Sequence, residues 1–105
     1  MMRDLKNKDG DPYLFGRDKL TMKVDPRLIC PPLDKAEIPK EQAKARAEGS
    51  LELFFARMNL ARFHPIYQDG DEVWEYNDIE MMSGTAGYVL LRGDTVVGRI
   101  VVMMS

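Results

Sequence analysis

The apolar residues are most concentrated near the end of the chain, where two β-type runs flank a short turn. The runs are residues 88–91 and 96–102. Gly93 and Asp94 lie between them, and a glycine at the first central position supplies the positive φ of a type II′ turn. The pattern therefore predicts a β-hairpin over residues 86–104.

The two-residue turn also predicts a register for this hairpin. It pairs Leu91 with Val96, Val89 with Gly98, and Gly87 with Ile100. In that register one face is mixed and the other is apolar throughout. The apolar face consists of Val89, Leu91, Val96, Ile100, Val102 and Met104. Such a face must be covered by the rest of the chain.

A second apolar pattern predicts one long helix over about residues 39–63. Pro39 suits the first turn of a helix, and Pro65 cannot continue one. Gly49 and Ser50 interrupt the pattern, so a kink or a new N-cap is expected there. Beyond Ser50 the apolar residues form two roughly opposite stripes at 100° per residue. One stripe is Leu51, Phe54, Phe55, Met58 and Ala61, and the other is Leu53, Ala56, Leu60 and Phe63.

The remaining segments complete an expected α+β fold. Residues 1–12 are polar and turn-rich and predict a flexible arm. Residues 13–15 and 20–24 predict an N-terminal hairpin or a single edge strand. Residues 72–82 fit either a strand at 73–76 or a short helix, and their composition favours the strand. We therefore expect one domain over residues 1–105, with an antiparallel sheet built on the C-terminal hairpin and packed by the helix.

Composition places the chain among small soluble domains. It has 105 residues, of which 45% are hydrophobic and 30% charged, as in ordinary globular proteins. No apolar run approaches the roughly 20 residues that span a bilayer, so no membrane association is expected. The first residues lack the apolar core of a secretory signal, and Cys30 is the only cysteine. Both features favour a cytoplasmic location.

The charges are distributed unevenly along the chain. Residues 1–47 carry eleven Lys and Arg against eight Asp and Glu, whereas residues 48–105 carry four against nine. This asymmetry fits a head-to-tail contact or two surface patches of opposite sign, although an ordinary solvated surface explains it more simply. Four basic residues, Arg17, Lys19, Lys23 and Arg27, lie near Tyr13 and Phe15 and would suit a nucleic-acid face. The overall net charge of −2 and the lack of a reader motif argue against that partner.

One segment, residues 64–76, gathers the groups best suited to holding a ligand. The candidate ligand-binding residues are His64, Tyr67, Asp69, Asp71, Glu72, Trp74 and Tyr76. Neighbouring carboxylates can act as an acid/base pair, and carboxylates beside ring faces can hold a cation. The simpler interpretation is a solvated acidic turn with Trp74 in the core. A calcium loop is excluded, because neither Gly70 nor Gly10 has the ligands that this template requires around it.

No catalytic residue, metal site or cofactor is predicted. One cysteine and one histidine cannot supply the ligands of a typical zinc site. Cys30 lies between Ile29 and Pro31 with no base next to it, and no Gly-x-Ser-x-Gly elbow is present. The Gly84–Gly87 spacing matches the GXXG loop of a nucleic-acid clamp, but it is better explained as a linker. The Arg92-Gly93-Asp94 tripeptide matches a cell-adhesion motif, but it is better explained as the hairpin turn.

The leading functional hypothesis is a small non-catalytic interaction or oligomerisation module that forms a homodimer through helix 51–63. It rests on the two apolar stripes of the helix, which cannot both face one sheet, and on the second face of the hairpin. The expected interface residues are Leu53, Ala56, Leu60, Phe63, Tyr88 and Arg99. The alternative is a small-ligand-binding domain or small enzyme that uses residues 64–76.

Overall fold

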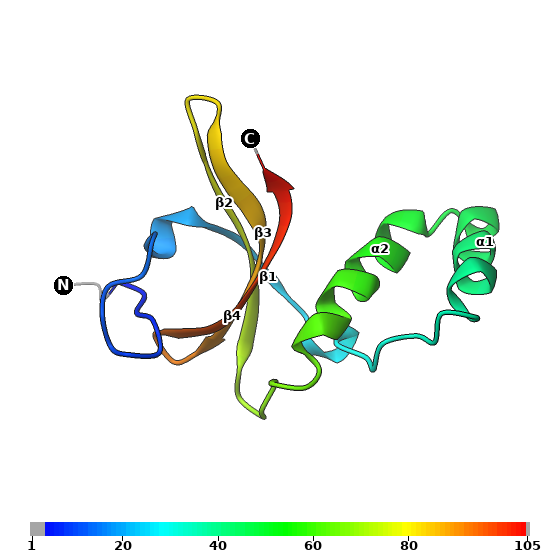
Figure 1. The fold of residues 1–105 in the computed structure, drawn as a ribbon, viewed down its shortest axis with the longest axis horizontal. Helices are drawn as coiled ribbons and strands as arrows, with labels where there is room; N and C mark the ends of the chain where they lie inside the picture. The colour runs from blue at the N-terminus through cyan, green and yellow to red at the C-terminus, as the bar shows by residue number, and fades with distance from the viewer. Residues whose placement is uncertain (1–3, 105) are drawn as a thin grey trace.

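A four-stranded antiparallel sheet forms the centre of the molecule, and two helices extend from one side of it (Figure 1). The structure is a computed structural model that describes residues 4–104. The strands are β1 (Leu20–Val24), β2 (Glu72–Glu80), β3 (Ser83–Arg92) and β4 (Thr95–Met104), and they lie in chain order. The expected α+β class is confirmed, and the N-terminal apolar residues supply one edge strand, β1. The strand predicted at 73–76 lies in the first half of the longer β2.

The expected single helix is divided into two, α1 (Ile38–Glu48) and α2 (Leu51–Leu60). Gly49 adopts the left-handed conformation, with φ 72°, and its N–H bonds the carbonyls of Ala45 and Arg46. This is the usual way in which a glycine ends a helix, because it has no Cβ to oppose a positive φ. The chain then starts α2 in a new direction. A short 3₁₀ turn, Ala61–Phe63, extends α2 towards His64.

The C-terminal hairpin forms as predicted at its turn but not along its length. Gly93 has a φ of 66°, and Leu91 pairs with Val96. The predicted pairs of Val89 with Gly98 and of Gly87 with Ile100 are wrong, because a bulge follows Val96. Leu90 pairs with Gly98, and Tyr88 pairs with Ile100. This extra residue reverses the facing of the side chains that follow it, so Ile100 lies on the face opposite Val96. A second irregularity, between Gly87 and Ala86, shifts the register again near the end of the strands.

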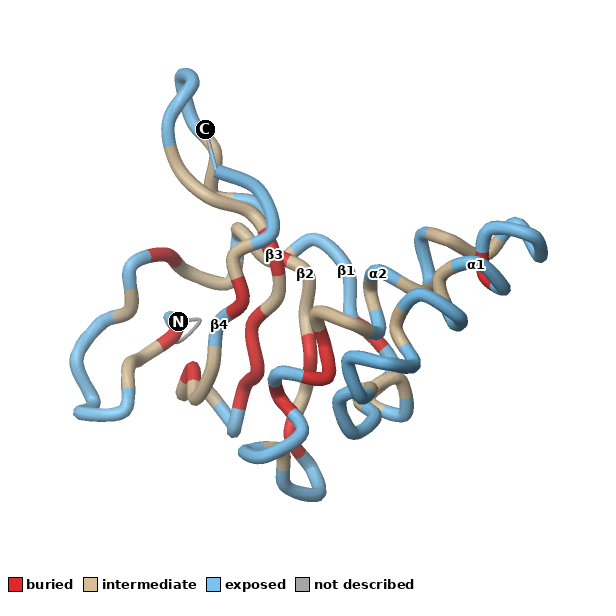
Figure 2. Tube along the Cα trace, turned by 45° about the vertical axis from the view of Figure 1, so that its right-hand side comes forward, coloured by how far each residue is buried: buried red, intermediate tan, exposed pale blue. Residues whose placement is uncertain are grey.

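The sheet has two covered faces rather than one (Figure 2). The first cluster of buried side chains comprises Leu5, Phe15, Tyr76, Val89, Leu91 and Val96. The second comprises Val24, Leu60, Phe63, Val73, Leu90 and Ile100. The N-terminal segment covers the first cluster, whereas the end of α2 and the 3₁₀ turn cover the second. Each element buries one apolar side, which is the physical basis of a layered fold.

Part of the expected arm at residues 1–12 is attached to the sheet. Leu5 is buried in the first cluster. Lys6 donates its N–H to the carbonyl of Asp94 and accepts from the N–H of Val96, at 2.8 Å in both bonds. Residues 1–3 of that expected arm lie outside the described residues.

The molecule is more extended than a chain of its length usually is. Its Cα radius of gyration is 15.0 Å, against about 13 Å for a compact domain of this length. Two features account for this shape in Figure 1: the pair of helices, which we call the helical arm (residues 38–60), and the turn between β2 and β3, which projects beyond the rest of the sheet. Both features expose apolar side chains, as described below.

Candidate binding groove on the helical arm

A groove lies between the helical arm and the segment that leads into it. This segment, residues 30–33, reads Cys-Pro-Pro-Leu and runs extended after a 3₁₀ turn, Pro26–Leu28. Its two prolines lack N–H donors and disfavour a helix before them, so the segment crosses the arm without joining it. The chain then reverses into α1, and α2 forms the opposite wall.

The groove has a volume of about 430 Å³, within the range usual for sites that take small molecules or side chains of a partner. Its apolar lining consists of Pro31, Pro32, Leu33, Ile38, Phe54, Met58 and Ala61. Phe54 and Met58 are four residues apart, so they share one side of α2. This is the stripe of α2 that does not face the sheet.

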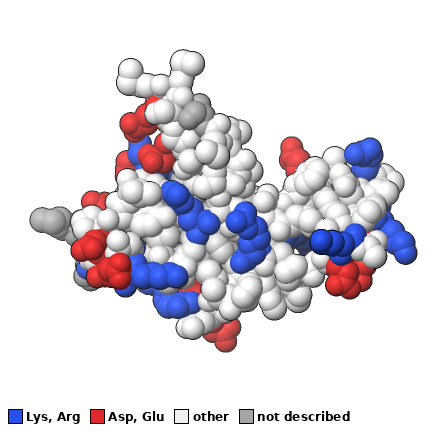
Figure 3. Space-filling view, viewed as in Figure 1, with Lys and Arg blue, Asp and Glu red and all other residues white. Residues whose placement is uncertain are grey.

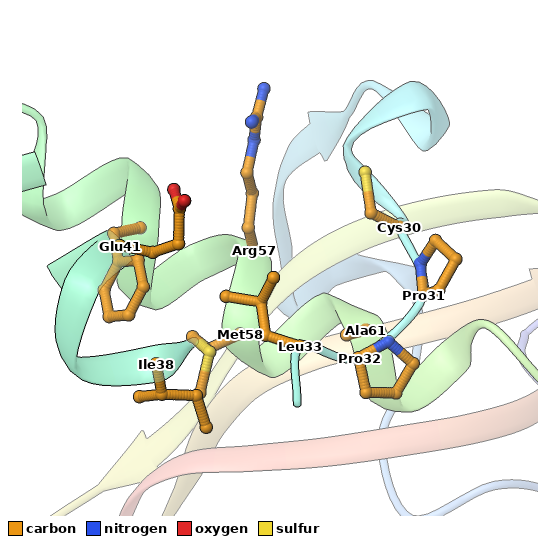
Figure 4. Close-up of a pocket in the computed structure, with 10 residues that line it drawn as sticks. Cys30, Pro31, Pro32, Leu33, Ile38, Glu41, Arg57, Met58 and Ala61 are labelled. Carbon is orange, nitrogen blue, oxygen red and sulfur yellow. The ribbon is translucent and has the colours of Figure 1, made fainter. Parts of the chain in front are cut away.

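Three polar groups stand at the edge of this groove: the Cys30 thiol, the Glu41 carboxylate and the Arg57 guanidinium. Figure 4 shows all three polar ends on one side of the groove, with Ile38, Met58 and Pro32 on the other side. Cys30 is exposed and free. No hydrogen bond or ion pair joins Glu41 or Arg57 to another of the described side chains, so both charges are available to a ligand or partner.

The arrangement is suited to binding an apolar group. An apolar floor with one cation and one anion at its edge can hold an apolar group and fix its flanking charges. Within residues 4–104, no three His, Cys, Asp or Glu side chains cluster in a way that could hold a metal ion. His64 does not line this groove, so no imidazole is placed beside the Cys30 thiol.

The acidic residues predicted in segment 64–76 are largely engaged within the fold. Asp71 is buried and accepts two hydrogen bonds from Arg92, from Nε at 3.0 Å and from Nη2 at 2.8 Å. It also accepts from the Gln68 N–H at 3.0 Å. The Arg92 guanidinium holds the pKa of Asp71 below its usual range. Asp69 and His64 are exposed nearby on the surface.

The aromatic residues of the same segment are divided between the two faces of the sheet. Tyr76 is buried in the first cluster, stacks on Phe15 at a ring-centroid distance of 4.7 Å, and bonds the Thr85 hydroxyl at 3.0 Å. Trp74 packs against the same cluster, whereas Tyr67 packs against the second. The structure therefore does not bring these rings together around one cavity.

Glu72 is held between two donors. It accepts the Trp74 indole N–H at 3.0 Å, and the Lys23 ammonium lies 3.4 Å from its other oxygen. The indole N–H, with a smaller contribution from Lys23, lowers the pKa of Glu72. Because successive residues of a strand point to opposite faces, Glu72 and Trp74 share a side that Val73 does not.

The expected interface residues also fall into two groups. Leu60 and Phe63 are buried against the sheet and offer no surface to a partner. Leu53 and Arg99 are exposed, and Ala56 and Tyr88 are half-buried. An interface on α2 therefore cannot include the last turn of the helix.

The four basic residues considered above as a nucleic-acid face are each paired with a carboxylate. Arg17 lies 2.6 Å from Asp94, Arg27 lies 2.8 Å from Asp25, and Lys19 pairs with Glu80. Lys23 pairs with Glu72, as described above. Figure 3 shows Lys and Arg side chains interspersed with Asp and Glu on this face of the molecule rather than as one continuous patch. This arrangement does not favour binding to a polyanion.

The groove combines residues that sequence reasoning did not join. Residues 31–33 and Ile38 were not singled out by any sequence pattern. The one sequence feature that pointed to the groove is the apolar stripe containing Phe54 and Met58. Because this stripe does not face the sheet, another segment has to cover it.

No helix of the described residues is long and apolar enough to cross a membrane. Comparison of the chain with models of protein families, with curated proteins and with solved structures finds no match.

Proposed function

We propose that this chain is a small non-catalytic interaction module that forms a homodimer through its helical arm. The observation that carries the proposal is the amount of surface the single chain leaves exposed. Its accessible surface is 7305 Å², whereas a compact monomer of this length exposes about 6,000 Å². The excess, about 1,300 Å², exceeds the roughly 800 Å² that each partner buries in a standard interface.

Apolar side chains on the arm support the same proposal. Phe55 and Leu53 are 47% and 42% exposed, and Phe55 contacts Phe54 edge to face at 5.4 Å. Phe54 in turn lines the groove. The exposed aromatic side chain therefore continues the apolar lining of the groove outward, and contiguous apolar surface of this kind is typical of interaction sites.

Two further features fit an interaction role in the cytoplasm. The polar groups that segment 64–76 would lend to catalysis are paired or dispersed, with Asp71 bound by Arg92. Cys30 is exposed and has no partner cysteine within the chain, which suits a reducing compartment.

The experiment compares the dimer dissociation constants of two variants by analytical ultracentrifugation. Phe55→Glu places a charge on the arm beside the groove, and Leu14→Glu places one on an apolar side chain that is 75% exposed in the N-terminal segment. We expect Phe55→Glu to weaken the dimer at least tenfold and Leu14→Glu to leave it unchanged. Equal dissociation constants for the two variants would refute the proposed interface.

A further inference from the structure

The turn between β2 and β3 carries two methionines that contact almost nothing in their own chain. Met81 and Met82 are 99% and 87% exposed. Ser83 pairs with Glu80 across them, so they are the two central residues of a two-residue turn. Near it, at the end of β4, Val102, Met103 and Met104 are also exposed. A projecting apolar turn of this kind can be inserted into a partner's groove.

The backbone of this turn is unfavourable for the residues that occupy it. Met81 and Met82 have φ angles of 49° and 72°, as a type I′ turn requires at both positions. Asn-Gly is the common sequence there, because these residues adopt a positive φ at low cost. The chain therefore places two large apolar side chains where a short polar pair would fold more easily. Such a departure points to a role outside the fold.

The groove on the helical arm matches this turn in size and in character. Unbranched, flexible methionine side chains fill irregular apolar spaces, and about 430 Å³ accommodates two of them. The charges of the two elements differ as well. Residues 75–85 carry three carboxylates and no Lys or Arg, and one of the three, Glu80, is paired with Lys19 of the same chain. Residues 35–63 carry six Lys and Arg against four Glu, and the groove has Arg57 and Glu41 at its edge. Figure 3 shows mainly carboxylates, with one basic side chain among them, just below the uncharged top of the hairpin, and both basic and acidic side chains on the arm.

We propose that the β2–β3 turn of one copy occupies the groove of a second copy. The turn and the arm project from different parts of the molecule in Figure 1, and no residue of the turn lines the groove of its own chain. If the two copies are related by a two-fold axis perpendicular to the line from turn to groove, the turn of each copy meets the groove of the other. This inference rests on the proposed homodimer and names the element that each copy contributes.

The first experiment links the two sites through the native cysteine at the edge of the groove. Ser83→Cys adds a second thiol beside the two methionines and keeps both of them. A short bismaleimide is added to the full chain, and linked peptides are identified by mass spectrometry. We expect a dimer in which residue 30 of one copy is joined to residue 83 of the other. Cys30→Ser in the same background should abolish this link.

The matched control for this experiment is Leu14→Cys, which places the added thiol on an exposed residue away from both sites. A link between residues 30 and 83 that is no more abundant than the link between residues 30 and 14 would overturn the inference. A ladder of trimers and larger species would contradict the two-fold pair.

The second experiment removes the methionines without endangering the fold. The double variant Met81→Asn, Met82→Gly has the favoured type I′ sequence, so we expect it to unfold at the same or a higher temperature at low protein concentration. Its dimer dissociation constant should rise at least tenfold. An unchanged dissociation constant would show that the turn is not the contact.

The two proposals can fail separately. An unsubstituted chain that is monomeric at every concentration would refute both the homodimer and the docking of the turn. A dimer that forms without the link between residues 30 and 83 would leave the homodimer in place and refute only the docking.

Discussion

Asp71 and Arg92 join the turn before β2 to the end of β3 through two parallel hydrogen bonds. The carboxylate is buried, with 2% of its side chain exposed, whereas the Arg92 side chain is 40% exposed. Arg92 also donates to the Ile66 carbonyl at 2.9 Å. The pair therefore fixes the path of the chain from the 3₁₀ turn after α2 into the sheet, and with it the position of the helical arm.

Replacing Asp71 with Asn should lower the free energy of unfolding by about 1–3 kcal/mol at neutral pH, the usual cost of losing hydrogen bonds to a charged group. Arg92 lowers the pKa of Asp71, so the carboxylate stabilises the fold fully above the ordinary aspartate pKa of about 3.9. That contribution is lost as the pH falls through the lowered pKa of the folded state. Urea unfolding between pH 7 and pH 2 checks this, and a difference between the proteins that grew on acidification would contradict it.

Leu60 and Phe55 should respond oppositely to truncation, because they lie on different sides of α2. Leu60 is fully buried and Phe55 is 47% exposed. Leu60→Ala is expected to cost about 2–5 kcal/mol of stability, whereas Phe55→Ala should cost no more than about 1 kcal/mol. Denaturant unfolding at low protein concentration measures both. Similar losses would mean that Phe55 belongs to the core.

Two glycines of the C-terminal hairpin should differ in their tolerance of a methyl group. A Cβ at Gly87 would lie 1.9 Å from the Ile100 carbonyl oxygen, which belongs to the backbone of the neighbouring strand. A Cβ at Gly98 would lie 2.8 Å from the end of the Ile66 side chain, which is 40% exposed and can move aside, and 3.0 Å from the buried Phe63 ring. We expect Gly87→Ala to cost more than about 3 kcal/mol and Gly98→Ala about 1–2 kcal/mol. Thermal unfolding of both variants gives the order, and the reverse order would contradict the register.

The N-terminal segment should contribute to stability despite its polar sequence. Leu5 is 1% exposed in the cluster that contains Tyr76 and Val89. Leu5→Ala is therefore expected to cost about 2–5 kcal/mol, whereas Leu14→Ala, at an exposed position, should change stability by less than about 0.5 kcal/mol. Circular dichroism during urea unfolding measures both, and equal effects would show that the segment does not pack on the sheet.

Local signals in the sequence were sufficient to predict the class of the fold. A glycine between two β-type runs, here Gly93, indicates a two-residue turn. A glycine after a helical run, here Gly49, commonly ends the helix. The bulge after Val96 was not visible, because an extra residue in a strand leaves the composition of the run unchanged. Its effect on register was large, since it moved Ile100 to the other face.

The geometry of the site was harder to predict than the fold. Asp71 looked available to a ligand because its hydrogen-bond partner, Arg92, lies 21 residues away in the sequence. Trp74 and Tyr67 looked like neighbours, although they pack on opposite faces of the sheet. The groove unites three separate segments with short apolar signals, and only the chain's path in space brings them together. Met81 and Met82 gave no signal of a site, because nothing local in the sequence indicates that a turn projects.

The central claim is self-association through the helical arm, and the solution mass of the unsubstituted chain tests it most directly. Light scattering behind a sizing column should be measured at two protein concentrations that differ about tenfold. The account predicts a mass of two chains at the higher concentration, and Phe55→Glu should shift it towards one chain under the same conditions. A mass of one chain for the unsubstituted protein at both concentrations would contradict the account.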